Sequence, residues 1–315
     1  MWKLLLTGVL LFYVCESARA TKYAGEFLYL GVGGRALAMG GAFTAIADDA
    51  TASYWNPAGL VNVPQREAIF MHSESFGKLL NLDYLSVVLP SDAGAFGFSA
   101  MRLGGGGIKL TGIEDPSQPI SETNRAYEVG EANHADYAFN LSYAKKAGDR
   151  VSIGVNGKII YRDIPETSAW GLGLDLGILY SLRESVKLAL VLQDATSTYL
   201  SYSTGSKETI APSLKVGLAY QKNWRDFDAT ISGDANFLFE DRSSSSQYVM
   251  GSMSADNNYG LEIAYQKILF GRMGFHYGEF TAGAGVLVAN WGLDFAYLNN
   301  EELDNSYQFS LKVKW

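Results

Sequence analysis

The chain has 315 residues, a formal net charge of −8 and a mean hydropathy of 0.00, although 48% of its residues are apolar. Its longest uncharged apolar run covers residues 4–14, well short of the ~20 residues of a membrane-spanning helix, so a helical membrane protein is excluded. An acidic chain without a basic cluster argues against nucleic-acid binding, which depends on gathered Lys and Arg side chains. Charged residues make up only 18% and aromatic residues 13%, which excludes a disordered chain.

The first 20 residues have the pattern of a secretory signal peptide. Lys3 supplies the positive charge, an apolar stretch follows, and the segment from Ala18 to Ala20 has the small residues of a cleavage site. We therefore expect export with cleavage after Ala20, which leaves residues 21–315. Cleavage would remove Cys15, the only cysteine, so the mature chain is expected to have no disulfide and no thiolate metal site.

Residues 21–65 form the next predicted segment, and they lack the alternation of a β-strand. The segment is rich in small residues, and its charged residues include Arg35, Asp48 and Asp49. Asn56 is expected to cap a short helix that begins at Pro57. Asn accepts a hydrogen bond from the first helical turn, and Pro lacks only an N–H that would be unpaired there. We expect a compact unit of short helices in this part of the chain.

From residue 66 to the C-terminus the sequence predicts β-strands, because apolar and polar residues alternate over long runs. One run carries Trp170, Leu172 and Leu174 on one face, with Gly171 and Gly173 on the other. The runs match the about 9–11 residues of a transmembrane β-strand better than the ~5–6 residues of a strand in a soluble protein. The predicted strands are 66–77, 80–90, 93–103, 134–146, 151–164, 168–181, 186–195, 212–222, 227–239, 257–266, 268–277, 281–290, 291–299 and 306–315.

Tight turns alternate with longer connections, of which 104–133, 196–211 and 240–256 are predicted to be long loops. Outer-membrane barrels have short periplasmic turns and longer outside loops. We therefore predict an all-β fold over residues 66–315, a transmembrane antiparallel β-barrel of about 14 strands with both of its ends on the periplasmic side. Aromatic residues near strand ends would form its interfacial girdles: Tyr143, Tyr161, Trp170, Tyr180, Trp224, Trp291 and Tyr297.

The last predicted strand ends the chain on an aromatic residue. Phe309, Leu311 and Val313 occupy every second position before Trp315. This pattern resembles the C-terminal assembly signal of bacterial outer-membrane proteins, which implies the barrel assembly machinery as a partner.

Several charged residues fall on the polar face of the predicted strands and are expected to face the lumen: Lys158, Arg162, Asp175, Lys215, Asp234 and Glu262. A barrel of about 14 strands is too wide for its own side chains to fill, so residues 21–65 are predicted to be a hatch that plugs it. Buried charges usually pair. Asp48 and Asp49 are therefore expected to anchor the hatch to Lys158, Arg162 or Lys215.

A family resemblance lies in the predicted hatch. The run from Gly33 to Leu60, GGRALAMGGAFTAIADDATASYWNPAGL, closely resembles the N-terminal region of the PorV/PorQ family. That family is related to the FadL-type transporters of long-chain fatty acids and aromatic hydrocarbons, in which a hatch with an Asn-Pro-Ala motif fills the lumen. Asn56, Pro57 and Ala58 match this motif, so the resemblance implies a bacterial outer-membrane barrel. The hatch and gate candidates are Arg35, Asp48, Asp49, Asn56, Pro57 and Ala58.

Three functions remain open. In the first, a hydrophobic small molecule passes the hatch and leaves sideways through the wall into the outer-membrane lipid. In the second, the protein is an accessory or shuttle protein of a type IX-like secretion system, and loop 104–133 docks a secretion-system component. In the third, the barrel is structural and transports nothing. We expect no enzyme, cofactor or metal, because His72, His134 and His276 lack catalytic or metal-ligand spacing.

Overall fold

The computed structural model describes residues 25–75, 79–240, 242, 246–300 and 305–315, and the predicted signal peptide, residues 1–20, lies outside them. The described chain begins with short helices and continues as β-strands. The helices are η1 (Glu26–Tyr29), α2 (Gly34–Ala38), α3 (Ala52–Trp55) and η2 (Pro57–Asn62). Within these ranges, no helix is long and apolar enough to cross a membrane.

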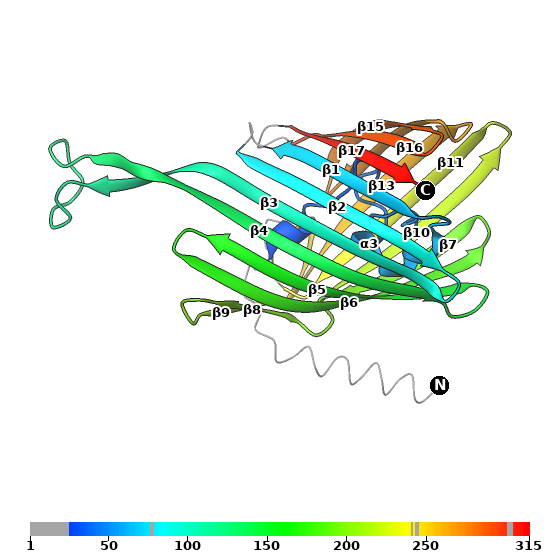
Figure 1. Ribbon diagram of the computed structural model, residues 1–315, viewed down its shortest axis with the longest axis horizontal. Coiled ribbons are helices and arrows are strands. Elements are labelled where there is room, and N and C mark those ends of the chain that lie inside the picture. The colour runs from blue at the N-terminus through cyan, green and yellow to red at the C-terminus, as the bar shows by residue number, and fades with distance from the viewer. Residues whose placement is uncertain (1–24, 76–78, 241, 243–245, 301–304) are drawn as a thin grey trace.

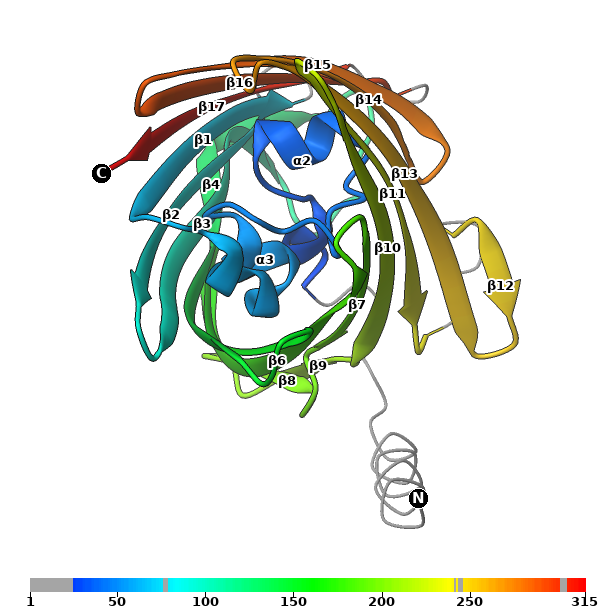
Figure 2. The ribbon, with the colours of Figure 1, turned by 90° about the vertical axis from the view of Figure 1, so that its right-hand side faces the viewer.

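The strands form one antiparallel sheet that closes on itself as a barrel (Figures 1 and 2). Strands β8, β9 and β12 belong to connections. The other 14 of the 17 described strands follow one another around the wall until β17 pairs with β1, which confirms the predicted barrel. The strands are β1 (Glu67–Ser75), β2 (Leu80–Ser91), β3 (Gly94–Ile113), β4 (Ala126–Lys146), β5 (Val151–Ile164), β6 (Thr167–Arg183), β7 (Val186–Gln193), β8 (Thr198–Tyr202), β9 (Lys207–Ile210), β10 (Ser213–Trp224), β11 (Phe227–Leu238), β12 (Tyr248–Met250), β13 (Met253–Tyr265), β14 (Leu269–His276), β15 (Glu279–Val288), β16 (Trp291–Leu298) and β17 (Ser306–Lys314).

The barrel has two different ends. At one end, tight turns join the strands, such as residues 92–93 between β2 and β3 and residues 225–226 between β10 and β11. Glu67 pairs with Lys314 at this end, so β1 begins there and β17 ends there. We call it the turn end. The opposite end, called the loop end, carries the long extensions of β3 and β4 and the β8–β9 hairpin (Figure 1).

The two faces of the wall differ in polarity, as the alternation predicts. On β17, Phe309 and Leu311 are exposed on the outside, whereas Ser310 and Lys312 are buried on the inside. Exposed aromatic side chains border the outside at both ends: Trp224, Trp291 and Trp315 at the turn end and Trp170 toward the loop end. The outside is therefore an apolar band between aromatic borders, which is the surface that suits lipid.

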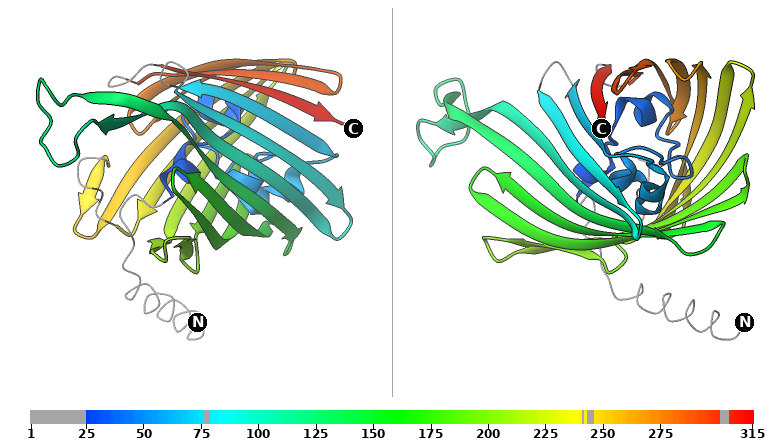
Figure 3. Two further views of the ribbon diagram at one scale, coloured as in Figure 1. Left: turned by 60° about the vertical axis from the view of Figure 1, so that its left-hand side comes forward. Right: turned by 45° about the vertical axis from the view of Figure 1, so that its right-hand side comes forward.

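The prediction that residues 104–133 form a loop is wrong, because most of this segment is strand. Only residues 114–125 join β3 to β4, and the outer parts of both strands leave the loop end as a two-stranded ribbon (Figures 1 and 3). We call residues 106–133 the β3–β4 ribbon. Two register shifts, after Gly105 and after Leu110, interrupt the regular alternation, so the sequence pattern does not reveal these strands.

Residues 25–65, the described part of the predicted hatch, lie inside the barrel (Figure 2). α2 packs against β14 to β17 and η2 packs against β3 to β6, so the hatch contacts opposite sides of the wall. Leu37, Phe43, Ile46 and Leu60 of the hatch are fully buried. The hydrophobic core of the protein therefore lies in the lumen, between the hatch and the inner faces of the strands.

Candidate functional site

Asn56 uses both ends of its side-chain amide to fold the hatch. Its nitrogen donates to the carbonyl oxygen of Thr44 at 2.9 Å, and its oxygen accepts from the backbone N–H of Ala58 at 3.0 Å. The second bond is the predicted N-cap of η2, with Pro57 at the first helical position. The three residues of the Asn-Pro-Ala motif are all buried, and they act here as capping and packing residues of the hatch.

Glycines on the inner face of the wall let the hatch approach closely. A Cβ on Gly154 of β5 would meet the backbone of Pro57, and one on Gly274 of β14 would meet the backbone of Met39. A side chain at either position would push the hatch away from the wall. Part of the high glycine content of the chain is therefore explained by the fit between hatch and wall.

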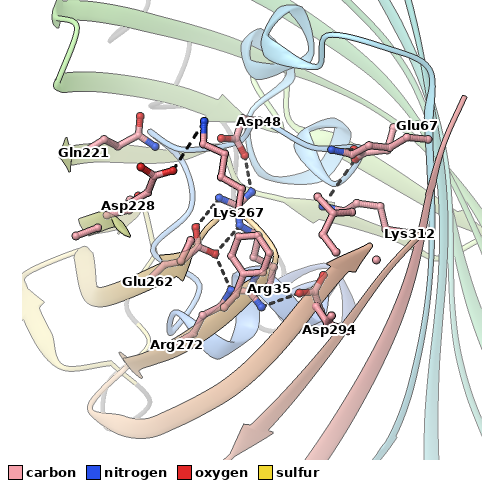
Figure 4. Close-up of a pocket in the computed structure, with 18 of the residues that line it drawn as sticks. Arg35, Asp48, Glu67, Gln221, Asp228, Glu262, Lys267, Arg272, Asp294 and Lys312 are labelled. Atoms are coloured by element: carbon pink, nitrogen blue, oxygen red, sulfur yellow. Dashed lines mark hydrogen bonds and ion pairs between the residues drawn. The ribbon is translucent and has the colours of Figure 1, made fainter. Parts of the chain in front are cut away.

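Arg35 on α2 is the centre of an ion network between the hatch and the wall (Figure 4). Its guanidinium donates to Asp48 at 2.6 Å and, through two nitrogens at 2.9 Å each, to both carboxylate oxygens of Glu262 on β13. Arg272 on β14 extends the network, with bonds of 2.6 Å to Glu262 and 2.6 Å to Asp294 on β16. Burial alone lowers the pKa of Arg35, but the carboxylates of Asp48 and Glu262 raise it above its ordinary value, so the cation stays charged.

Asp49 links the hatch to the last strand of the barrel. The ammonium group of Lys312 on β17 lies 3.2 Å from the carboxylate of Asp49. Thr51 also donates to the Asp49 carboxylate, through its hydroxyl and through its backbone N–H. Burial alone raises the pKa of Asp49, but the charges of Lys312 and Arg35 lower it well below its usual range. Asp49 therefore stays ionised and ties the hatch to the strand that closes the barrel.

Asp234 on β11 holds a third part of the hatch. Its carboxylate accepts from the backbone N–H of Phe43 at 3.0 Å and from that of Thr44 at 2.9 Å. A hydrogen bond to a charged group contributes about 1.5–3 kcal/mol. Of the six predicted lumen charges, Asp234 and Glu262 are the two that hydrogen-bond the hatch in the described residues.

The prediction that the hatch carboxylates Asp48 and Asp49 pair with Lys158, Arg162 or Lys215 is wrong. Asp48 pairs with Arg35 at 2.6 Å, inside the hatch itself, and Asp49 pairs with Lys312. The reason is the position of the two groups in the lumen: Asp48 lies with Arg35 and Lys312 at the turn end, whereas Lys158 lies with Tyr54 and Asp194.

Two of the three wall cations have carboxylate partners on the wall or its connections. Lys158 lies 2.9 Å from Asp194, just after β7, and 3.1 Å from Asp175 on β6. Arg162 donates to Asp136 on β4 at 2.8 Å. These charges therefore connect neighbouring strands and stabilise the lumen wall.

Lys215 on β10 meets the hatch through aromatic rings. Its ammonium group lies 5.8 Å from the ring centroid of Tyr54 and 5.5 Å from that of Trp55. A cation over an aromatic face is attracted by about 0.5–2 kcal/mol, more when water is excluded. Lys215 is thus a hatch contact as well, by a chemistry that alternation could not predict.

A cavity of about 380 Å³ lies at the turn end, on one side of the hatch (Figure 4). Most of its lining side chains are polar or charged, including the network of Arg35 and the lysines Lys267, Lys312 and Lys314. We call it the turn-end cavity. Charged walls favour water and polar solutes over apolar molecules.

A second cavity, of about 370 Å³, lies at the loop end on the other side of the hatch. Leucines from the hatch, β2, β3 and β16 line it: Leu30, Leu80, Leu82, Leu103 and Leu298. Polar and charged side chains line the rest of it, among them Glu26, His276 and Glu279, and Arg242 pairs with Glu26 at 2.7 Å. We call it the loop-end cavity. Sequence reasoning missed it, because its leucines come from separate segments that only the closed barrel brings together.

The barrel is closed, its N-terminal hatch lies in the lumen, and a cavity lies on either side of the hatch. These features define the class of protein as a hatch-plugged β-barrel. The chain belongs to an uncharacterised protein family, UPF0164, whose model matches residues 14–175. A UPF0164 protein of Treponema pallidum (strain Nichols) is 30% identical over 152 residues, which cover 46% of this chain and 35% of that protein. The chain thus matches about a third of the length of this curated relative.

Solved structures share the fold at low sequence identity. The Ralstonia pickettii toluene transporter TbuX has a TM-score of 0.59 at 14% identity, over 90% of this chain and 98% of that one. The monoaromatic hydrocarbon channel CymD has a TM-score of 0.59 at 13% identity, over 91% and 98%. A Pseudomonas aeruginosa FadL homologue has a TM-score of 0.51 at 13% identity, over 88% of this chain and 96% of that one. The predicted relation to FadL-type barrels is confirmed for the fold, and the closer resemblance to the PorV/PorQ family stays a prediction.

Proposed function

We propose that the protein is a bacterial outer-membrane barrel that carries a hydrophobic small molecule through its lumen, past a hatch that must move. The observation that carries this proposal is the leucine-lined loop-end cavity beside the hatch. Support comes from the fold, which is shared with proteins named as a toluene transporter and a monoaromatic hydrocarbon channel. A purely structural barrel would not need a cavity lined by five leucines at one mouth of the barrel.

The two ends of the barrel suggest its orientation in the membrane. Outer-membrane barrels have short turns on the periplasmic side and longer segments outside. The turn end, where β1 begins and β17 ends, would therefore face the periplasm. The loop end, with the β3–β4 ribbon and the leucine-lined cavity, would face the cell exterior, where a substrate arrives. The predicted signal peptide is consistent with this placement.

The loop-end cavity sets the class of molecule. Each methylene group that leaves water for an apolar surface contributes about 0.8 kcal/mol. The volume of about 370 Å³ lies at the small end of the roughly 300–1,000 Å³ of ligand pockets. Because Arg242 is already paired with Glu26, it is not free to select an anion. We therefore expect uncharged apolar molecules, or apolar chains with one small polar end.

The hatch is the barrier between the two cavities. Leu30 and Glu26 of the hatch line the loop-end cavity, and Arg35 and Asp48 line the turn-end cavity. A molecule that enters at the loop end must therefore displace part of the hatch, which is tied to β11, β13 and β17. Opening must break or rearrange at least one of these links.

Uptake by Gram-negative host cells that lack their own FadL-type carriers tests the proposal. The unaltered protein should raise uptake of radiolabelled palmitate or toluene above that of cells without it. Leu82→Gln or Leu103→Gln should lower this uptake by about tenfold, because a polar amide in an apolar pocket costs at least ~1.4 kcal/mol. Leu82→Met, which conserves volume and polarity, is the matched control and should transport normally.

Failure of the unaltered protein to carry either compound would contradict the proposal. Recovery of the protein in a stable complex with a secretion channel, from cross-linked outer membranes, would then favour the secretion role that the PorV/PorQ resemblance implies. Neither result would alter the fold.

A further inference from the structure

Four ionisable side chains interrupt the apolar outside of the wall on β1, β2 and β3. Even-numbered positions of β1 face outward, as at the exposed Phe70, so His72 and Glu74 do as well. His72 is the register partner of Asp83 on β2, and Asp83 is the partner of Arg102 on β3. Directly opposite residues of an antiparallel pair share a face. We call His72, Glu74, Asp83 and Arg102 the outer polar cluster.

The outer polar cluster is held together by contacts among its members. Nδ1 of His72 lies 2.7 Å from one carboxylate oxygen of Asp83, and the guanidinium of Arg102 lies 3.4 Å from the other. A Cβ on Gly104 would lie 2.7 Å from that guanidinium, so Arg102 occupies room that a side chain would fill. The four side chains are between 33% and 46% exposed. A cation and a carboxylate are therefore both accessible on a face that is mainly apolar.

The outer polar cluster lies near the loop end. His72 is three positions, about 10 Å at ~3.3 Å per residue, from Ser75, where β1 ends. Charged residues on the lipid face of an outer-membrane barrel cost little near the interface and much more at the membrane midplane. In the placement proposed above, the cluster therefore lies at the level of the outer lipid headgroups.

An apolar groove of about 490 Å³ begins at this cluster, on the outside of β1, β15, β16 and β17. His72 belongs to its lining. The exposed side chains of the lining are all apolar: Phe70, Ala284, Leu293, Phe309 and Leu311. Phe70 and its register partner Leu311 lie on the turn-end side of His72. The groove therefore runs from the outer polar cluster toward the middle of the membrane.

Small residues form the floor of the groove. Ala284 faces outward opposite Gly271 of β14, and no atom lies within 4 Å of a Cβ built on Gly271. On its other side Ala284 is opposite Phe295, whose ring centroid lies 5.1 Å from that of Phe309. The outside thus steps down from aromatic rings to alanine and glycine, which leaves a hollow that an extended hydrocarbon chain can fill.

We propose that the outer polar cluster and the groove together bind one phospholipid of the outer leaflet, with a zwitterionic phosphoethanolamine headgroup. A guanidinium has five N–H donors. The contact with Asp83 engages one nitrogen of Arg102, so Arg102 can also donate to a phosphate. The ammonium group of the lipid would pair with Asp83, and one acyl chain would lie in the groove. This inference rests on the membrane placement in the proposed function and is independent of transport.

The charges of the outer polar cluster select among lipids. An anionic phospholipid such as phosphatidylglycerol would supply a partner for Arg102 and none for the carboxylate of Asp83. The phosphates of lipid A call for several cations, whereas Arg102 is the one Lys or Arg side chain of the cluster. A zwitterionic headgroup satisfies both signs of charge at once.

Native mass spectrometry of the full folded barrel tests the site. The protein is transferred from micelles that contain equal amounts of phosphatidylethanolamine, phosphatidylglycerol and lipid A. One phosphatidylethanolamine should be retained in preference to phosphatidylglycerol by about tenfold, the effect of one hydrogen bond to a charged group. Arg102→Met and Asp83→Asn should each remove this preference. Arg125→Met, at an exposed arginine near the tip of the β3–β4 ribbon, is the matched control and should keep it.

The groove has its own pair of variants. Ala284→Phe should lower the retention of phosphatidylethanolamine at least about fivefold, because part of the acyl chain loses its apolar contact. Ala235→Phe, on the outside of β11, should not. Heat-modifiable migration in electrophoresis shows that each variant is folded.

Equal retention of phosphatidylethanolamine and phosphatidylglycerol by the unaltered protein, or stronger retention of lipid A, would overturn the site. A barrel that retains phosphatidylethanolamine and carries neither palmitate nor toluene would support the site and contradict the proposed function. The two failures can therefore be told apart.

Discussion

Replacing Arg35 by methionine should loosen the hatch without unfolding the barrel. The change keeps an unbranched aliphatic stem and removes a guanidinium that donates to two carboxylates at 2.6, 2.9 and 2.9 Å. Glu262 keeps Arg272 as a partner at 2.6 Å, so the loss falls mainly on Asp48 and on the link between α2 and β13.

The cost of this change follows from the contacts. Removal of one member of a buried ion pair costs about 3–5 kcal/mol. Because Glu262 keeps Arg272 as a partner, Arg35→Met should cost ~3 kcal/mol, at the lower end of this range. Since 1.4 kcal/mol corresponds to a factor of ten, the equilibrium constant for local opening of the hatch should rise roughly 100-fold. Arg102 offers a matched control. Its half-exposed side chain makes a 3.4 Å contact with Asp83, so Arg102→Met should cost less than about 1 kcal/mol.

Hydrogen exchange with mass spectrometry measures the opening directly. Peptides that cover residues 34–50 should lose protection roughly 100-fold in Arg35→Met, whereas peptides from β4 and β5 should keep theirs. Arg102→Met should leave both regions unchanged. If exchange in the hatch stays within about threefold of the unaltered protein, Arg35 does not hold the hatch and the reasoning is refuted.

Three further changes test other parts of the account. Gly154→Ala should speed hatch exchange at least about fivefold, because an overpacked contact costs about 1–3 kcal/mol and 1.4 kcal/mol is a factor of ten. Gly157 lies on the same strand, and a Cβ there would have no atom closer than 3.9 Å. Gly157→Ala should therefore leave hatch exchange unchanged, and equal effects of the two substitutions would contradict the close fit of hatch and wall. The pKa of Asp49 is lowered in the folded protein. The ionised Asp49 therefore stabilises the folded protein at every pH above its unfolded pKa of about 3.9, and this stabilisation is lost only as the pH falls below that value. Asp49→Asn should therefore lower hatch protection by the same factor at about pH 7 and at about pH 5, and a clearly smaller effect at pH 5 would oppose this assignment. Serine at Phe309 and Leu311 should slow the appearance of the folded, heat-modifiable form in pulse-chase experiments, and normal assembly would remove the assembly-signal role.

The wall could be predicted from the sequence wherever its alternation is uninterrupted. The last strand was expected at 306–315 and lies at Ser306–Lys314. The β3–β4 ribbon could not be predicted in the same way, because four glycines carry no apolar signal and two register shifts change the parity. The strand pattern thus depends on side chains that glycine lacks and on a register that only pairing fixes.

The candidate site could be predicted only in part. Parity placed Asp234 and Glu262 on the lumen side, and both contact the hatch. The partners of the hatch carboxylates could not be predicted, since Asp49 pairs with Lys312, 263 positions away in the chain. That pairing depends on how the hatch is rotated and how deep it sits, and both are set by the packing of small residues against wall glycines.

A tether between the hatch and the wall tests most directly whether molecules pass by displacement of the hatch. A Cβ on Gly97 of β3 would lie 2.5 Å from the Ser53 hydroxyl oxygen of α3, so cysteines at both positions are close enough for a disulfide. In host cells with the double variant, palmitate uptake should be low while the disulfide is intact. It should return to the level of the single-cysteine variants once a reductant is added. Equal uptake before and after reduction, with the disulfide verified by mass spectrometry, would contradict gating by the hatch.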